Sequence, residues 1–455
     1  MRQTFSLPAS VDHALKTLTD AGFHAYVVGG AVRDLLRGHT PKDWDVTTNA
    51  TPEQIMKLFP NAHLDNAFGT VGVPLKYLGE KKNTGVLEIT PFRTEGPYQD
   101  FRRPSSVSWG KTIEEDLERR DFTINAMAFS PIHELVDPFG GKTDLHHAII
   151  RTVGKPHDRF SEDALRMLRA VRLHIQLGFT VDPTTLMAIK ENSHLLRYIS
   201  GERIRDELLL MLKADLNLCA EGFSLMRDLG ILTIILPELD AAFAQKQARH
   251  HTWDVGKHSI ESLRHCPSND PVVRLATLLH DIGKPAVAKR VSSELVTFFN
   301  HEVVGVPIAR NILDRLHVSK KDRDRILNLI RWHQFSVDEY ITDAAVRRFI
   351  ARVGPDNIDD MIDLRIGDRL GGGCKEAESW RLKLFRKRLW EVQHPPPTVA
   401  DLAIDGNDVM KILDLKPGPQ VGAVLKELFE ETVDEPKKNN REYLLRRLET
   451  ILKGK

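Results

Sequence analysis

The stretch Lys42-Asp43-Trp44-Asp45-Val46 decides how the first part of this chain is interpreted. Side chains alternate along a strand, so on a strand Asp43 and Asp45 would lie on one face and Trp44 on the other. Two carboxylates side by side are typical ligands of a divalent cation that handles phosphates. The stretch therefore predicts a metal-assisted centre, with an ordinary pair of exposed strand residues as the alternative.

A phosphate-binding turn is expected just before this pair. The apolar residues 25–28 lead into Gly29-Gly30, and residues 31–37 have the pattern of a short helix. The free backbone N–H groups and the positive dipole end at a helix N-terminus bind anions. The Gly pair is therefore predicted to lie against the phosphates of a nucleotide.

The wider pattern predicts an α/β region followed by helices. Strands are expected at residues 25–28, 44–47, 71–78 and 85–90, and helices at 11–21, 51–58 and 112–120. Beyond a cluster of turn residues at 137–141, amphipathic helices dominate. The predicted fold class is a mixed β-sheet head with helices (1–140), an all-α neck and body (141–245), a second all-α module (246–370) and an α-helical tail (371–455).

Bulk properties exclude few functions. The 455 residues exceed one ordinary core, and 64 Lys and Arg against 63 Asp and Glu give a net charge of +1. A nucleic acid would therefore have to be held by local basic stripes. The sequence shows no membrane-spanning run and no secretory signal at its start, and its three scattered cysteines are typical of reduced thiols. We expect a cytoplasmic protein, and no stable protein partner is predicted.

Further charged residues complete a candidate nucleotide site. Glu88, on the neighbouring expected strand, would be the third carboxylate, with a solvated strand glutamate as the alternative. Arg119 and Arg120 suit phosphate oxygens through bidentate donors, and Asp121 could accept a hydrogen bond from a ribose hydroxyl. The alternative for this second group is a surface cluster of salt bridges.

A pair of residues farther along could read a base. Residues 161–172 are expected to form a helix capped by Ser161, with Asp163 and Arg166 on one face. Such a pair is usually only a helix-stabilising salt bridge. A carboxylate beside a guanidinium also complements the amino donor and ring-nitrogen acceptor of cytosine and adenine, whereas uracil and guanine would leave it mismatched. The pair could therefore select CTP and ATP without a template.

Six motifs occur in order along the first half of the chain: Gly29-Gly30-Ala31-Val32-Arg33-Asp34, Asp43-Trp44-Asp45, and residues 119–127, 137–141, 162–172 and 202–207. Together they resemble the class II tRNA nucleotidyltransferases, the CCA-adding enzymes. The resemblance implies a polymerase-β-like nucleotidyltransferase head that extends the 3′ end of tRNA from CTP and ATP. It implies Asp43 and Asp45 as magnesium ligands and, with Glu88, as catalytic carboxylates. The implied nucleotide-binding residues are Gly29, Gly30, Arg33, Arg119, Arg120, Asp121, Asn125, Asp163, Arg166, Arg169 and Arg172.

Three relatives share this kind of head. Bacterial poly(A) polymerases carry a Gly-Arg-Arg-Phe-like stretch after the catalytic strand, whereas residues 64–71 here resemble the CCA-adding pattern. Enzymes that add only CC lack a flexible loop after the third-carboxylate strand, and this chain keeps one at residues 92–104. Enzymes that add only the terminal A keep that loop as well. Full CCA addition is the prediction, with A-only addition and poly(A) synthesis as alternatives.

A second constellation follows residue 246. His280 and Asp281 are adjacent, and Gly283-Lys284-Pro285 after them predicts a helix end. With distant His and Asp residues, the pair is typical of a metal-ligand set assembled between helices. The set resembles the HD phosphohydrolase superfamily. The implied ligands of a divalent transition metal or Mg²⁺ are His258, His280, Asp281, His301, His333 and Asp368.

The role of this module stays open in the sequence. The resemblance implies phosphodiesterase or phosphatase activity, with a structural or regulatory metal site as one alternative. Another alternative is that this module carries the main activity and the head only binds tRNA. Residues 249–252 are expected to precede its first helix, with His251 near a phosphate. Basic residues of the tail could hold tRNA phosphates or form ordinary solvated helix faces: Arg386, Lys387, Arg388, Lys437, Lys438, Arg441, Arg446 and Arg447.

Overall fold

The computed structural model describes residues 5–65, 69–80, 85–95, 98–99, 103–104, 107–132, 134–247, 253–292, 296–335, 337–338, 340–393 and 398–453. It divides into two compact units. One unit contains residues 1–335 and 353–377, and the other contains residues 336–352 and 378–455. The described helices include none with the length and apolar character needed to cross a bilayer.

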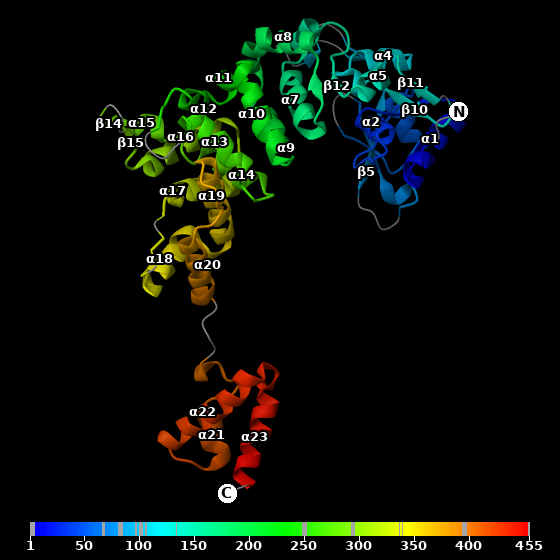
Figure 1. Ribbon diagram of the computed structural model, residues 1–455. Helices are drawn as coiled ribbons and strands as arrows, with labels where there is room; N and C mark the ends of the chain where they lie inside the picture. Colours follow the sequence, from blue (N-terminus) through cyan, green and yellow to red (C-terminus); the bar gives the residue numbers. More distant parts are fainter. Residues whose placement is uncertain are drawn as a thin grey trace. The chain divides into compact units, whose positions relative to one another are not determined.

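The head, blue to cyan in Figure 1, is built on a seven-stranded mixed sheet. The strand order is β11-β10-β1-β2-β5-β4-β3. The strands are β1 (Ala25–Val28), β2 (Asp45–Thr48), β3 (His63–Leu64), β4 (Val71–Pro74), β5 (Val86–Pro91), β10 (Ala128–Ser130) and β11 (Glu134–Val136). Only the β2–β5 pair of this sheet is parallel, and its register sets Asp45 opposite Glu88. The head helices are α1 (Ala9–Asp20), α2 (Gly30–Leu36), α3 (Pro52–Leu58), α4 (Ile113–Glu118) and α5 (Gly141–His146). The predicted mixed-sheet head is confirmed.

Two local predictions in the head are wrong. Strand β2 begins at Asp45, so Asp43 lies in the bend before it instead of on the strand. Strand β4 ends at Pro74, where the chain turns into a short 3₁₀ helix, Leu75–Tyr77, although the apolar pattern predicts a strand to residue 78. Helix α3 begins as predicted, because Thr51 and Gln54 form a capping box.

The loop expected at residues 92–104 contains short paired strands where it is described. Strand β6 (Arg93–Glu95) pairs with β9 (Val107–Trp109), and β7 (Tyr98–Gln99) pairs with β8 (Arg103–Pro104). Residues 96–97 and 100–102 of this loop lie outside the described residues, as do Asn66, Ala67 and Phe68 of the 64–71 signature.

Beyond the head the first unit is largely helical, as predicted. Its neck and body contain α6 (Pro156–Glu162), α7 (Leu165–Leu177), α8 (Pro183–Asn192), α9 (Gly201–Leu212), α10 (Leu216–Asp228), α11 (Ile231–Ile235) and α12 (Pro237–Ala242). The next module contains α13 (Val255–Arg264), α14 (Pro271–Leu279), α15 (Lys284–Val287), α16 (His301–Arg315), α17 (Lys320–Trp332) and α19 (Ile358–Gly371). Two-stranded pairs, β12 (Ile149–Ile150) with β13 (Thr180–Val181) and β14 (Lys289–Arg290) with β15 (Val296–Thr297), interrupt these helices.

Two predicted helix boundaries are also wrong. Ser161 does not cap a helix, because a Pro at position 156 starts α6 earlier and Asp163 is extended between α6 and α7. The Asp163 side chain instead accepts the N–H of Leu165 at the start of α7. Helix α14 ends at Leu279, before Gly283. Gly283 serves close packing, since a Cβ there would lie 2.1 Å from the carbonyl oxygen of His301.

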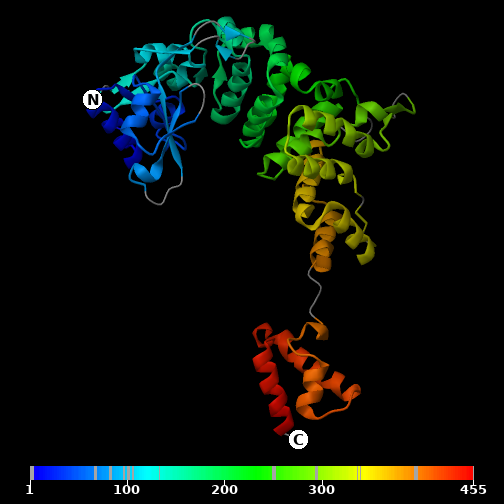
Figure 2. The ribbon, with the colours of Figure 1, turned by 180° about the vertical axis from the view of Figure 1, so that it is seen from behind.

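The second unit is helical throughout its described part. It contains most of α18 (Asp343–Val353), followed by α20 (Trp380–Gln393), α21 (Gly406–Leu413), α22 (Pro419–Asp434) and α23 (Arg441–Lys453). Helices α21 to α23, orange to red in Figure 2, share an apolar core that includes Val409, Leu428 and Leu444. The tail prediction is therefore confirmed in its helical character.

Candidate nucleotide and metal centres

Three carboxylates gather at the edge of the head sheet. Asp45 opens β2, Glu88 is its register partner on β5, and Asp43 stands two residues earlier in the bend. All three line one cavity of about 470 Å³. Asp43 also lines a larger cavity of about 860 Å³ between α2 and the helices of the neck and body. The three carboxylates that the sequence predicts as one centre therefore lie close together, although Asp43 is not on the strand.

The electrostatics of these carboxylates fit a divalent cation. Loss of hydration raises the pKa of Asp45, and Asp43 adds to the rise while Arg120 opposes it. The pKa of Glu88 is raised by the same loss of hydration and then by Asp45, Asp65 and Asp43. Like charges held this close favour a cation between them, and oxygen donors are the ligands that Mg²⁺ prefers.

One buried aspartate holds the two predicted phosphate-binding arginines. Asp116 on α4 accepts hydrogen bonds from Arg119 at 2.7 Å and from Arg120 at 3.1 Å, and its side chain is fully buried. Burial alone would raise the pKa of Asp116, but Arg120 and Arg119 outweigh it and hold the pKa below its usual range. Sequence reasoning missed Asp116. Its spacing of three and four residues before the arginines on a helix was a readable signal.

Glycine 29 lets Arg120 approach the catalytic strand. Its φ is +71°, a left-handed conformation that suits glycine. A Cβ here would lie 2.9 Å from an Arg120 guanidinium nitrogen and 3.9 Å from a carboxylate oxygen of Asp45. The Gly pair therefore gives the arginine room beside the carboxylate, in addition to the backbone role that the sequence predicts.

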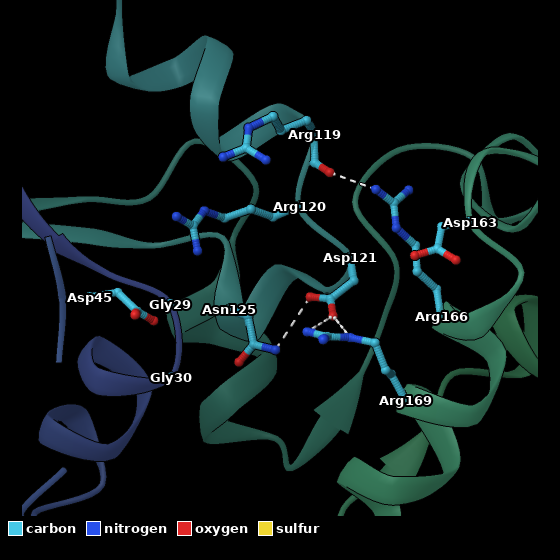
Figure 3. A pocket seen from close by; sticks show the side chains of 10 residues that line it. All are labelled: Gly29, Gly30, Asp45, Arg119, Arg120, Asp121, Asn125, Asp163, Arg166 and Arg169. Atoms are coloured by element: carbon cyan, nitrogen blue, oxygen red, sulfur yellow. Dashed lines mark hydrogen bonds and ion pairs between the residues drawn. The ribbon is translucent and has the colours of Figure 1, made fainter. Parts of the chain in front are cut away.

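Asp121 is anchored deeply in the same pocket. Its carboxylate accepts the Nε–H of Arg169 at 2.6 Å and the amide of Asn125 at 3.3 Å (Figure 3). It also accepts the backbone N–H of Phe122 at 2.8 Å. Burial would raise its pKa, but Arg169 and Arg166 lower it to about 2. Arg33 in turn donates to the Asn125 carbonyl at 2.8 Å. These contacts join α2, the segment after α4, and α7 around one carboxylate.

The predicted base-reading pair does not form a mutual salt bridge. Asp163 is clamped by both guanidinium nitrogens of Arg203 on α9, at 3.1 and 2.6 Å. Arg166 donates to Glu162 at 2.5 Å and to the Arg119 carbonyl at 2.8 Å. Both side chains still line one cavity (Figure 3). The helix-stabilising alternative is therefore wrong, and Arg203 is a supporting residue that the sequence did not single out.

Nine of the eleven predicted nucleotide-binding residues line one cavity of about 290 Å³. They are Gly29, Gly30, Arg119, Arg120, Asp121, Asn125, Asp163, Arg166 and Arg169, and Asp45 lines the same cavity. Arg33 and Arg172 line the adjoining larger cavity instead, where Arg172 donates to Glu207 at 2.6 Å. The cavity thus joins Asp45, the two arginines held by Asp116, and Asp163 with Arg166.

A second centre lies in the module after residue 253. Its residues come from five helices: His258 from α13, His280-Asp281 from the end of α14, His301 from the start of α16, His333 from the end of α17 and Asp368 from α19. One Asp281 oxygen lies 3.3 and 3.2 Å from the Nε2 atoms of His258 and His280. The other lies 3.2 and 3.7 Å from those of His301 and His333. Asp368 approaches His258 at 3.2 Å, so all six predicted ligands are brought together.

Main-chain carbonyls orient three of these imidazoles. The Nδ1 atoms of His280, His301 and His333 lie 2.7, 2.8 and 2.7 Å from the carbonyl oxygens of Thr277, Phe298 and Ile330. A proton on Nδ1 leaves Nε2 with a lone pair directed into the centre, which is the arrangement that metal-binding histidines use. The buried Nε2 of His280 has no hydrogen-bond partner, which also fits a metal ligand.

The two carboxylates make the second centre attract positive charge, either a proton on an imidazole or a metal ion that displaces it. Burial would lower the pKa of His280, but Asp281 and Asp368 raise it to about 10, while burial lowers the pKa of His333. Among the described residues, the groups whose three ligand atoms lie within 4.8 Å of one another all belong to this centre. Four imidazoles and two carboxylates fit one or two divalent transition-metal ions. His251 and its neighbours at 249–252 lie outside the described residues.

The basic residues of the tail are mostly paired with acids of the same unit. Arg441 contacts Asp408 at 2.6 Å, Lys438 contacts Glu435 at 2.8 Å and Arg447 contacts Glu431 at 3.1 Å. Arg386, Lys387, Arg388 and Arg446 also pair with acids, namely Glu378, Glu391, Asp343 and Glu442. These contacts favour the alternative of ordinary charged helix faces for these residues individually.

Four family models match separate stretches of the chain. Residues 25–151 match the model of the poly(A) polymerase head domain and residues 248–370 that of the HD domain. Residues 178–243 match the model described as the probable RNA and SrmB-binding site of polymerase A, and residues 391–448 match the one described as tRNA nucleotidyltransferase domain 2, putative.

Individual relatives point to one family. The A-adding tRNA nucleotidyltransferase of Deinococcus radiodurans is 33% identical over 425 residues, which cover 89% of this chain and 91% of that protein. The CCA-adding enzyme of Lactobacillus helveticus is 50% identical over 197 residues, or 43% of this chain and 48% of that protein. The chain spans about half the length of the curated CCA-adding relatives that it matches at such identity.

The fold agrees as well. A crystal structure of the Bacillus stearothermophilus CCA-adding enzyme in complex with CTP is similar, with a TM-score of 0.60 at 28% identity over 99% of this chain and 100% of that one. The chain belongs to the class II tRNA nucleotidyltransferases, the family of the CCA-adding enzymes, and it carries an HD domain within its helical part.

Proposed function

We propose that this protein adds the sequence CCA to the 3′ ends of tRNA, using CTP and ATP and releasing pyrophosphate. The observation that carries the proposal is the 290 Å³ cavity, in which Asp45, the arginine pair held by Asp116, and the Asp163–Arg166 pair converge. A nucleoside triphosphate needs all three kinds of contact, to its α-phosphate, its phosphate chain and its base.

The side chains then have separate tasks in the transfer. Arg119 and Arg120 bind triphosphate oxygens and orient the α-phosphorus toward Asp45. The tRNA 3′-hydroxyl attacks this phosphorus; a new P–O bond forms and the bond to pyrophosphate breaks. Mg²⁺ held by Asp43 and Asp45, with Glu88 beside them, would supply Lewis-acid stabilisation of the developing charge. The arginines contribute the protein's own share of this charge stabilisation.

The choice of base follows from how neighbouring groups hold the side chains of Asp163 and Arg166. Arg203 presents the Asp163 carboxylate, and Glu162 with the Arg119 carbonyl presents the Arg166 guanidinium. A fixed acceptor beside a fixed donor suits cytosine and adenine, and it leaves uracil and guanine with mismatched groups. Selection of CTP and ATP therefore rests on protein side chains without a nucleic-acid template.

A second candidate is addition of the terminal A alone. It is favoured by one observation, the similarity along 89% of the chain to a protein described as an A-adding tRNA nucleotidyltransferase. Poly(A) synthesis and a non-catalytic, tRNA-binding head remain as further alternatives. Intact Asp43, Asp45 and Glu88 at one cavity speak against a non-catalytic head.

Truncated tRNAs separate these activities. The purified chain is incubated with tRNA that lacks the last three nucleotides, and with tRNA that ends in CC, each with labelled CTP, ATP or both. The proposal expects two C followed by one A on the first substrate. Addition of A to tRNA-CC alone would establish the A-adding function instead. Long A tracts would establish a poly(A) polymerase, and no incorporation would reject the proposed head activity.

For the HD domain we propose a metal-dependent phosphohydrolase that works independently of the head. Support comes from the six buried or half-buried ligands, among which main-chain carbonyls orient three imidazoles with their Nε2 atoms toward the centre. A divalent ion there would polarise a phosphate ester and activate water. Release of phosphate from model mono- and diesters by metal-loaded protein tests this function, and a metal-loaded protein that releases none would leave the domain with a structural or regulatory role.

A further inference from the structure

One ligand of the HD centre is more exposed than the other five. The side chains of His258, His280, Asp281, His301 and His333 are at most 4% exposed. Asp368 is different, since its side chain is 18% exposed. A substrate of this centre must therefore reach it past Asp368, on the α19 side.

An arginine stands at this opening. Arg365, one turn before Asp368 on α19, donates from one terminal nitrogen to the Asp368 Oδ2 atom at 3.0 Å. The other carboxylate oxygen, Oδ1, faces the imidazoles of His258 and His280 at 3.2 and 3.6 Å. The Asp368 carboxylate thus lies between the Arg365 guanidinium and the imidazole nitrogens of His258 and His280. The Arg365 side chain is 25% exposed.

Most N–H donors of the Arg365 guanidinium have no acceptor among the described residues. Among the contacts of the described residues, its one hydrogen bond is that to Asp368, and the guanidinium carbon lies over the Phe335 ring, 5.5 Å from the ring centre. A guanidinium has five N–H donors in a rigid fork that matches two oxygens of a phosphate group. Arg365 therefore has donors left for a second, anionic partner while it still touches Asp368.

Another cation of the centre has a different environment. Lys284 contacts Asp281 at 2.5 Å and donates to Gln247 at 2.7 Å, and its side chain is only 8% exposed. Lys284 is thus enclosed and paired on the inner side. Lys284 and Arg365 balance the charges of Asp281 and Asp368 in the HD centre. Bound divalent ions would therefore give the centre a net positive charge, which attracts an anion to its more exposed side.

We propose that Arg365 binds the phosphate group of the substrate at the mouth of the HD centre. The proposal rests on the phosphohydrolase function proposed above and adds a binding subsite for a phosphate mono- or diester. The guanidinium receives two phosphate oxygens through its unused N–H edge, and Asp368 fixes the guanidinium on one side. Arg365 accordingly contacts substrate and is not only a support for the Asp368 carboxylate.

Inorganic phosphate and Co²⁺ provide a test that does not depend on turnover. The full chain is loaded with Co²⁺, and phosphate binding is followed through the visible absorption of the metal held by histidines, so that the head pocket does not contribute. His280→Ala, which removes a ligand, gives the blank. The variants are Arg365→Gln and Arg365→Lys, and Arg310→Gln removes an exposed arginine of α16 as the matched control. Co²⁺ affinity is measured for each variant, and CTP binding to the head verifies folding.

We expect Arg365→Gln to weaken phosphate binding roughly tenfold to a hundredfold, as for loss of a hydrogen-bonded charge pair. Arg365→Lys should recover part of this loss, because it restores charge but not the fork, and Co²⁺ affinity should stay within about threefold. Phosphate affinity within twofold of wild type in Arg365→Gln would overturn the proposal. An equal fall of Co²⁺ and phosphate affinity would also overturn it, since Arg365 would then only support Asp368. Wild-type protein that binds phosphate in this way but hydrolyses no ester would reject the hydrolase function and leave the subsite standing.

Discussion

The head and the HD domain each gather acidic side chains for a metal ion, but they do so in opposite ways. The head carboxylates of Asp43, Asp45 and Glu88 are open to solvent and line a cavity. The HD ligands are nearly all buried, and main-chain carbonyls turn their imidazoles inward. The HD centre is therefore organised before a metal arrives, whereas the head centre needs a cation to offset the like charges of its carboxylates.

The largest expected effect is the loss of nucleotide addition in Asp45→Asn, a variant of the head centre. Nucleotide addition should fall by roughly a thousandfold or more, since metal-assisted stabilisation contributes several kcal/mol. Stability should stay equal or rise slightly, because the raised pKa of Asp45 reports lost hydration and repulsion from Asp43. Incorporation assays and urea unfolding test both, with Asp12→Asn on α1 as the control. Activity within tenfold of wild type would remove Asp45 from the catalytic group.

A second variant breaks the support of the head site. Asp116→Asn leaves Arg119 and Arg120 with one neutral amide oxygen in place of their buried carboxylate, and breaking such a buried charge pair costs about 3 kcal/mol or more of folding free energy. The KM for CTP should rise as the arginines lose their positions, while Co²⁺ uptake by the HD domain is unaffected. Glu114→Gln, an exposed residue of the same helix, is the matched control. Unchanged stability and unchanged KM together would contradict the assigned role of Asp116.

The sequence predicted much of both centres for different reasons. Short-range rules gave β1, α3 and the neighbouring β2 and β5, because apolar runs, caps and glycines act locally. The partners Asp116, Glu162, Arg203 and Glu207 were missed as site residues, since each takes its role from packing between elements such as α7 and α9. The HD ligands came from a resemblance, and their inward orientation depends on carbonyl groups that no sequence pattern displays.

The buried Asp121 gives the head a distinct pH dependence. Its folded pKa of about 2 lies below the ordinary value of 3.8, so its stabilising effect is complete above about pH 4 and is lost as the pH falls toward 2. The shift corresponds to about 2 kcal/mol. Urea unfolding of wild type and Asp121→Asn between pH 2 and 5 should show a difference that shrinks on acidification. A difference independent of pH would contradict the paired carboxylate.

The smallest expected effect concerns base choice. Arg203→Met releases the clamp on Asp163, so the preference for CTP and ATP over UTP and GTP should fall by roughly tenfold, about one charged hydrogen bond. Arg205→Met is the matched control, because Arg205 lies on the same helix but pairs with Asp206. Competition among the four triphosphates measures the preference. If both variants keep the wild-type preference, Arg203 does not position Asp163 for base reading.

The central claim is that two independently built centres share this chain, and His280→Ala tests it most directly. Bound Co²⁺ and CTP incorporation into truncated tRNA are measured on the same protein preparation. We expect loss of histidine-bound Co²⁺ with nucleotide addition in Mg²⁺ within twofold of wild type, because among the described residues His280 contacts none of the head residues that line the nucleotide cavity. A parallel loss of metal and addition in a folded variant would contradict it.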